Sequence, residues 1–147
     1  MIARYDFEPS YQKANVFGHI QLSEDWYFCI DTRIIWIPKG YVCDGASIPR
    51  VFWSIVGSPF DPNNAVGAWA HDYLYLTHLT DKNTADEVAF QLWRQAGIRL
   101  LKARVMWFAV NKFGGFAWKN DEEDEKSLIE LRKIIAFHPE KNKFDIV

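Results

Sequence analysis

The 147-residue chain has few of the features that would assign it to a specialised class of protein. It holds two cysteines, Cys29 and Cys43, which are too few for the disulfide framework of a small secreted domain. We interpret both as free thiols in a reducing compartment, where disulfides are rare. The N-terminus lacks the basic and then apolar pattern of a signal peptide. The sequence therefore predicts a protein that is not secreted by a signal peptide.

Two further absences limit the expected partners. No apolar run reaches the roughly 18 residues that identify a membrane span. Lys and Arg number 17 against 19 Asp and Glu, so the chain has no basic surplus of the kind that nucleic-acid binders carry. We therefore expect no transmembrane segment and no nucleic acid as partner, and the oligomeric state is left open.

The motifs of the common transition-metal sites are also missing. The sequence contains neither an HExxH pattern nor a closely spaced cysteine pair. His71 and His78 are seven residues apart, which is about 10 Å along a helix and too far for both to bind one ion. If the chain binds a metal, a hard cation held by carboxylate and carbonyl oxygens fits better than zinc.

Apolar and aromatic side chains, by contrast, are abundant. They make up 49% of the residues and include 7 Trp and 11 Phe, so disorder over most of the chain is not expected. The length suits a single domain over residues 1–147 with a substantial core. His138-Pro139 should end the last helix, and we expect a mobile tail over residues 138–147.

The N-terminal half has the pattern of strands and turns. Residues 1–15 are mixed and polar, and we interpret them as an ordered lead-in. Alternating, β-branched and aromatic residues then predict three or four short strands, with a hairpin around Asp31-Thr32. The expected strands cover residues 16–22, 26–30, 33–37 and 41–43. A turn-rich connector follows at 44–50.

Helical spacing dominates the second half. Helices are expected from Asn63 or Asn64, from Thr84 to about Ala96, over 98–112 and over 121–137. Thr84 and Glu87 fit a capping box, and the segment 98–112, which is apolar almost all round, should be the central helix. The predicted fold is α+β, a small antiparallel sheet in the N-terminal half followed by a helical bundle of three to four helices.

Three polar residues interrupt the apolar helical pattern. His71 and Tyr75 lie one turn apart on one helical face, and Asp86 heads the apolar stripe of the next helix. The short loop between these helices makes them antiparallel neighbours, so Asp86 can reach His71 and fix its tautomer. Such a buried pair also occurs as a purely structural hydrogen bond between helices, and that interpretation stays open.

Other candidates surround this pair. Asp72 diverges from His71 by about 100° on the helix, so it would be available to a cation, with Asp44 as a further ligand. Ser47 could form a nucleophilic triad with His71 and Asp86, although it lacks the strand-to-helix turn typical of such nucleophiles. Asp44 and Ser47 can equally be turn formers.

The order of these motifs resembles the phage and prophage family called domain of unknown function 1353, over roughly residues 16–118. The motifs are Asp44-Gly45-x-Ser47-Ile48-Pro49, His71-Asp72-x-x-Tyr75, Ala85-Asp86-x-x-x-Phe90, Val110-x-x-Phe113-Gly114 and Trp118. The family carries no established activity. The resemblance implies a bacteriophage or prophage origin, with the host cytoplasm or the virion as the location.

A second, local resemblance concerns His71-Asp72-x-x-Tyr75, which is similar to the HDxxY helix of secreted and parvoviral phospholipase A2. It implies that His71 is a general base that activates water and that Asp72 binds calcium. Asp86 would then orient His71, and Tyr75 would brace the network. The connector from Asp44 to Ser47, which includes Gly45, would have to replace the glycine-rich calcium loop of those enzymes.

Two functional hypotheses follow. In the first, the protein is a phage-encoded, metal-assisted hydrolase of ester or phospholipid-like substrates, with His71, Asp86 and Tyr75 in the catalytic site and calcium as the favoured cation. In the alternative, it is a non-catalytic phage structural or host-interaction protein whose partner is a virion or host protein. The His–Asp network would then only hold the helices together.

Overall fold

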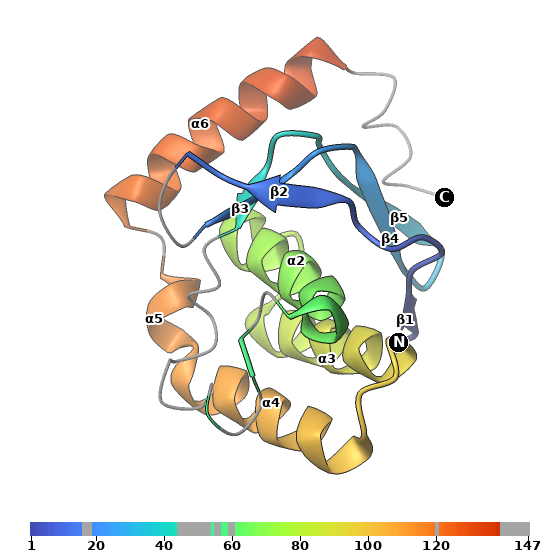
Figure 1. Ribbon diagram of the computed structural model, residues 1–147. Helices are drawn as coiled ribbons and strands as arrows, with labels where there is room; N and C mark the ends of the chain where they lie inside the picture. The colour runs from blue at the N-terminus through green and yellow to red at the C-terminus, as the bar shows by residue number, and fades with distance from the viewer. Residues whose placement is uncertain (16–18, 44–53, 55–56, 59–60, 120, 139–147) are drawn as a thin grey trace. The chain divides into compact units, whose positions relative to one another are not determined.

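The computed structural model describes residues 1–15, 19–43, 54, 57–58, 61–119 and 121–138 (Figure 1). The chain divides into two compact units, Met1–Cys43 with Asn120–Val147, and Asp44–Lys119. The single domain over residues 1–147 stays a prediction, and so does the mobile tail, of which only His138 is described.

The first unit contains a sheet with the strand order β1-β4-β5. Its strands are β1 (Ala3–Arg4), β4 (Trp26–Ile30) and β5 (Arg33–Ile37), all antiparallel. β4 and β5 form the predicted hairpin, in register from Trp26 opposite Ile37 to Ile30 opposite Arg33. Asp31 in the turn has a φ of 53°, a left-handed conformation that Asp tolerates better than most residues.

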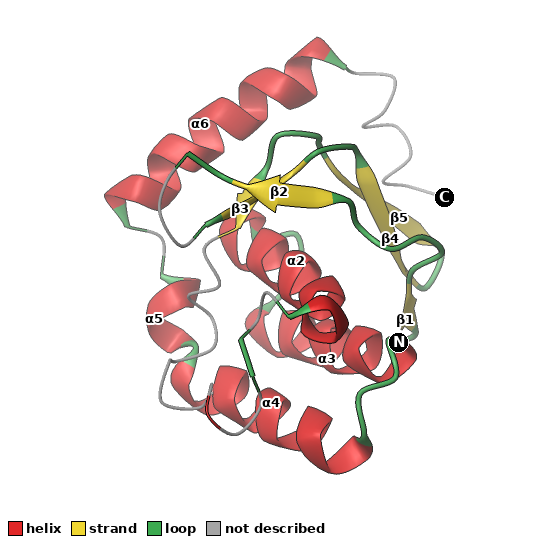
Figure 2. Ribbon diagram, in the orientation of Figure 1, coloured by secondary structure: helices red, strands yellow, loops and turns green. Residues whose placement is uncertain are grey.

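A second three-stranded sheet has the order β2-β3-β6. It consists of β2 (Tyr11–Lys13), β3 (Ile20–Leu22) and β6 (Val42–Cys43). The prediction of one small sheet was incomplete, because β3 pairs with β2 and β6 rather than with the β4–β5 hairpin. β1 and β2 both arise within the polar lead-in, where strand periodicity is weak. Figure 2 shows the strands in yellow.

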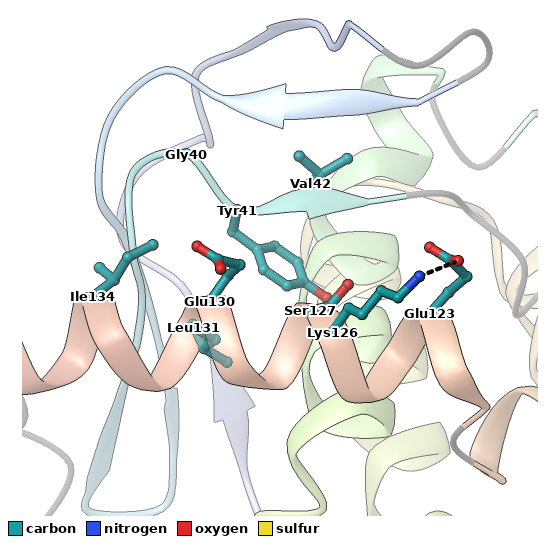
Figure 3. A pocket seen from close by; sticks show the side chains of 9 residues that line it. All are labelled: Gly40, Tyr41, Val42, Glu123, Lys126, Ser127, Glu130, Leu131 and Ile134. Atoms are coloured by element: carbon teal, nitrogen blue, oxygen red, sulfur yellow. Dashed lines mark hydrogen bonds and ion pairs between the residues drawn. The ribbon is translucent and has the colours of Figure 1, made fainter.

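The same unit contains α6 (Glu122–Phe137), which confirms the helix predicted over 121–137. A capping box begins it, in which Asp121 accepts from Asp124 N at 2.9 Å and Asp124 accepts from Asp121 N at 3.0 Å. α6 borders a groove of about 410 Å³ beside β6, which no predicted site residue lines (Figure 3). The lining residues are Gly40, Tyr41, Val42, Glu123, Lys126, Ser127, Glu130, Leu131 and Ile134.

The second unit contains four helices among its described residues. They are α2 (Pro62–Thr77), α3 (Lys82–Gln95), α4 (Leu100–Phe113) and the single turn α5 (Gly115–Trp118). Two sheets in the N-terminal half followed by α2–α6 confirm the predicted α+β class. Within the described residues no helix is both long and apolar enough to cross a membrane.

α2 and α3 approach closely because α2 has no side chain at Gly67. A Cβ at that position would lie 2.6 Å from Cδ1 of Trp93 on α3. Trp93 is fully buried, and its indole Nε1 donates to the carbonyl of Asn64 at 2.8 Å. The missing side chain at Gly67 therefore allows the Trp93 ring of α3 to lie directly against the backbone of α2.

The start of α3 differs from the prediction. Thr84 does not cap it, because Asp81 does: the Asp81 carboxylate accepts from Thr84 N at 3.0 Å. A carboxylate at the N-cap satisfies a free helix N–H and also interacts favourably with the helix dipole. The earlier start places Lys82 in the helix, one turn before Asp86.

The helix predicted over 98–112 is present as α4, but the prediction that it is the central helix was wrong. α4 buries one face, which consists of Ala103, Met106, Ala109 and Val110. On the opposite face, Leu101 is 79% exposed and Phe108 is 46% exposed. An apolar composition all round a helix indicates burial in most proteins, but here Leu101 and Phe108 are exposed on the face opposite the buried one.

Substituting Gly67 tests the close approach of α2 and α3. We expect Gly67→Ala to lower the free energy of unfolding by about 1–3 kcal/mol, because overpacking against the Trp93 ring outweighs the gain in helix propensity. Urea denaturation measures the change. Gly115→Ala is the matched control, since a Cβ there meets nothing within 4 Å. Equal stability of both variants would contradict the proposed contact.

Candidate functional site

Three of the predicted residues meet in the second unit. His71 and Tyr75 lie on α2, and Asp86 lies on α3. His71 Nε2 lies 2.7 Å from Asp86 Oδ1, and the Tyr75 hydroxyl donates to the same oxygen at 2.6 Å. The two rings pack with centroids 4.0 Å apart. His71 is 1% exposed and Asp86 is 0% exposed, so the cluster is a buried polar network.

The other carboxylate oxygen of Asp86 binds two groups that the sequence did not reveal. Lys82 Nζ lies 2.9 Å from Oδ2, and Asn111 Nδ2 donates to it at 3.1 Å. Lys82 is one turn before Asp86 on α3, whereas Asn111 comes from α4. The carboxylate thus accepts four hydrogen bonds, two on each oxygen, which explains how a charged group can be buried here.

Lys82 also connects the network to the end of α4. Its Nζ donates to the carbonyl of Val110 at 3.2 Å and to that of Asn111 at 2.9 Å. The last carbonyls of a helix have no partner within the helix, and a cation there is favoured by the helix dipole. Through Asp86 and Lys82, polar groups of α2, α3 and α4 therefore converge on one point.

The environment sets the charges of the pair. Burial lowers the pKa of His71, although Asp86 opposes this effect. Burial alone would raise the pKa of Asp86, but the hydrogen bonds from His71, Tyr75 and Lys82 outweigh it and keep this pKa below its usual value. Burial and the bond to Asp86 raise the pKa of Tyr75. At neutral pH the site therefore holds a neutral imidazole and an ionised carboxylate.

These charges also define the tautomer of His71. An ionised carboxylate only accepts hydrogen bonds, so His71 Nε2 carries the proton and donates it to Asp86. Nδ1 then carries the free lone pair. It is buried and has no hydrogen-bond partner among the described residues. The network thus orients a neutral imidazole with one nitrogen available to accept a proton.

The remaining predicted site residues are placed only in part. Asp72 follows His71 on α2 and is partly buried. Asp44, Gly45 and Ser47 lie outside the described residues. Over the described part of the chain, no cluster of three or more His, Cys, Asp or Glu side chains is suited to a metal ion. The cation site and the role of Ser47 stay predictions.

Comparison with known proteins identifies the family. The model of the family described as Protein of unknown function (DUF1353) matches residues 20–110, which is more than half of the chain. The chain belongs to this family, as its motifs predicted. The matched region includes all of α2 and α3 and therefore His71, Tyr75, Lys82 and Asp86.

One relative is a protein of Sinorhizobium fredii (strain NBRC 101917 / NGR234) named Uncharacterized protein y4jT. It is 34% identical over 95 residues, which are 64% of this chain and 28% of the relative. The match therefore spans less than a third of that protein's length. No solved structure matches the chain significantly.

The charge states predict a loss of stability in acid. Because burial lowers the pKa of His71, the unfolded chain binds a proton below about pH 6.5 that the folded chain does not. The free energy of unfolding should then fall with decreasing pH, by at most about 1.4 kcal/mol per pH unit from this group. Asp86, whose pKa is also lowered, acts in the same direction near pH 4 and below.

Urea denaturation between neutral pH and about pH 5 measures this effect. His71→Gln keeps an N–H donor for Asp86 but cannot titrate, so it should flatten the pH dependence in that range. Gly115→Ala, which changes no titratable group, is the control and should leave the pH dependence unchanged. A wild-type slope in His71→Gln would contradict a buried neutral His71.

Removing the charge of Asp86 should destabilise the second unit strongly. Asp86→Asn replaces one acceptor oxygen by a donor amide, which faces donors from His71, Tyr75 or Lys82. We expect a loss of about 3–5 kcal/mol in the free energy of unfolding, as for other broken buried ion pairs. Glu87→Gln, the next residue on α3, should change stability by less than about 0.5 kcal/mol. Similar effects of the two substitutions would show that Asp86 is not the centre of the network.

Proposed function

We propose that the protein is a hydrolase of ester substrates in which His71 is the general base. The proposal rests on the difference between the surroundings of the two ring nitrogens of His71. Nε2 is bonded to Asp86 at 2.7 Å, whereas Nδ1 is buried with no partner among the described residues. A general base needs a fixed orientation and a free lone pair.

In the proposed reaction, Nδ1 of His71 accepts a proton from a water molecule, and the water oxygen adds to the ester carbonyl carbon. The carbon–oxygen bond to the alcohol then breaks, and the alcohol takes the proton from Nδ1. Asp86 stabilises the imidazolium that exists between these steps. Tyr75 and Lys82 keep Asp86 ionised and fixed, so both are positioning residues.

A divalent cation is a further part of the proposal. Asp72 follows the base on α2, and Asp44 is its candidate companion as a ligand. Their oxygen atoms are suited to calcium more than to zinc. A bound cation would supply positive charge for the carbonyl oxygen as it becomes negative.

We also infer a bacteriophage or prophage origin, which the ordered motifs from Asp44 to Trp118 support. The expected location is then the host cytoplasm or the virion. If the hydrolase proposal is wrong, the remaining hypothesis is a non-catalytic phage structural or host-interaction protein in which the His71–Asp86 pair joins two helices.

Activity of His71→Gln separates these hypotheses. We expect the wild-type protein to hydrolyse p-nitrophenyl esters or phosphatidylcholine, and His71→Gln to lower kcat at least about 100-fold, the usual minimum contribution of a general base. The substitution should preserve the fold, because the amide still donates to Asp86. Turnover is measured with added calcium and with EDTA. If Asp72 binds the cation as proposed, Asp72→Asn should lower the turnover that calcium supports.

His78→Gln is the matched control, since it changes a histidine at the end of the same helix whose ring stacks on Trp118 with centroids 3.8 Å apart. It should retain wild-type kcat. Turnover in His71→Gln equal to that of the wild type, or none in the wild type with any of these esters in either buffer, would contradict the hydrolase. A well-folded His71→Gln without turnover would contradict the purely structural role.

A further inference from the structure

α4 and α5 carry an unusual number of exposed apolar side chains. Leu101 is 79% exposed, Phe108 is 46% exposed and Phe116 is 92% exposed. Leu100 and Phe113 are also about half exposed. Such side chains are costly to leave in water when they gather on one element, and they commonly mark an interaction site.

Helical spacing places two of these apolar side chains on one stripe together with two basic side chains. Leu101, Arg104, Phe108 and Lys112 are separated by three or four residues, so they lie on the same face of α4. The buried face of Ala103, Met106, Ala109 and Val110 lies opposite. α5 continues directly from α4 (Figure 1) and adds Phe116. We call the exposed side chains of Leu101, Arg104, Phe108, Lys112 and Phe116 the α4–α5 face.

The charge of this region is of one sign. Residues 88–120 contain no Asp or Glu, although the whole chain has a net charge of −2. The same segment contains six basic residues: Arg94, Arg99, Lys102, Arg104, Lys112 and Lys119. This segment therefore has a positive net charge, because its basic residues are not balanced by any Asp or Glu.

We propose that the α4–α5 face docks on the surface of an anionic phospholipid membrane. A helix that combines exposed Leu and Phe with Lys and Arg has the composition of interfacial helices, which insert apolar side chains at the acyl boundary and place basic groups among the headgroups. A nucleic acid would use the basic residues, and its bases can stack on an exposed Phe, but it offers no apolar environment for the aliphatic side chains of Leu100 and Leu101. The lipid surface satisfies both features.

Docking there would place the buried site near the membrane. Lys82 Nζ binds the last carbonyls of α4, and the ring of Trp118 in α5 packs edge-on against Tyr75 with centroids 5.2 Å apart. The inference does not depend on catalysis by His71, since it rests only on the exposed face. Loss of vesicle binding and loss of ester turnover are separate outcomes.

Co-sedimentation of the full chain with vesicles tests the proposal. We expect binding to vesicles that contain phosphatidylglycerol, weak binding to pure phosphatidylcholine, and a decrease with added salt. Phe108→Ser or Phe116→Ser should lower the partition coefficient about tenfold or more by removing an inserted ring. Lys112→Gln should lower it about fivefold, as expected for one basic group near an anionic surface.

Matched controls come from the first unit. Phe137 is 84% exposed and lies on α6, so Phe137→Ser removes a comparable ring from the other unit. Lys133→Gln removes a comparable exposed lysine. Both should bind vesicles as the wild type does, and thermal melts should show that every variant is folded.

Three results would overturn the proposal. One is the absence of vesicle binding by the folded wild-type protein. Another is vesicle binding that the control substitutions weaken as much as those on the α4–α5 face. The third is binding to single-stranded RNA that Lys112→Gln weakens, together with no binding to anionic vesicles, which would assign the basic residues to nucleic acid.

Discussion

The second unit depends on one buried carboxylate. An unpaired ionised side chain would be prohibitively costly at the 0% exposure of Asp86. Four donors from three helices compensate for this cost: His71 and Tyr75 on α2, Lys82 on α3 itself, and Asn111 on α4. The carboxylate thereby connects α3 to both α2 and α4. Each oxygen of the Asp86 carboxylate accepts two hydrogen bonds, which also leaves little freedom for the helices to slide past one another.

Part of this site was predictable from local geometry. One helical turn separates His71 from Tyr75, and the short connection to the next helix makes Asp86 their antiparallel neighbour. Lys82 was harder to foresee, because its place in the first turn of α3 depends on capping by Asp81 rather than by Thr84, although its i, i+4 spacing to Asp86 was a usable signal. Asn111 had no local signal, since its contact joins residues 25 apart in sequence.

The fold, like the site, has local features that the sequence predicts and non-local features that it does not. The hairpin of β4 and β5 has a local turn at Asp31 and was predictable, whereas the pairing of β3 with β2 and β6 is not local and follows from the packing of the whole unit. For α4, the pattern of apolar residues predicted burial on all sides. Sequence periodicity records only that a residue is apolar. It cannot distinguish an apolar residue that faces a core from one such as Leu101 that faces outward.

His71 links the structural network to the proposed chemistry. A residue needed only to donate one hydrogen bond to Asp86 could be a Trp, whose indole N–H donates and leaves no acceptor nitrogen. The imidazole leaves one at Nδ1, as far as the described residues extend, and a buried polar atom without a partner costs about 1–3 kcal/mol. The same burial that creates this cost keeps the ring neutral, which is the state a general base requires at rest. Under the proposed function, the atom that carries this cost is also the atom that would take the proton, so the loss of stability and the general-base role would have one origin.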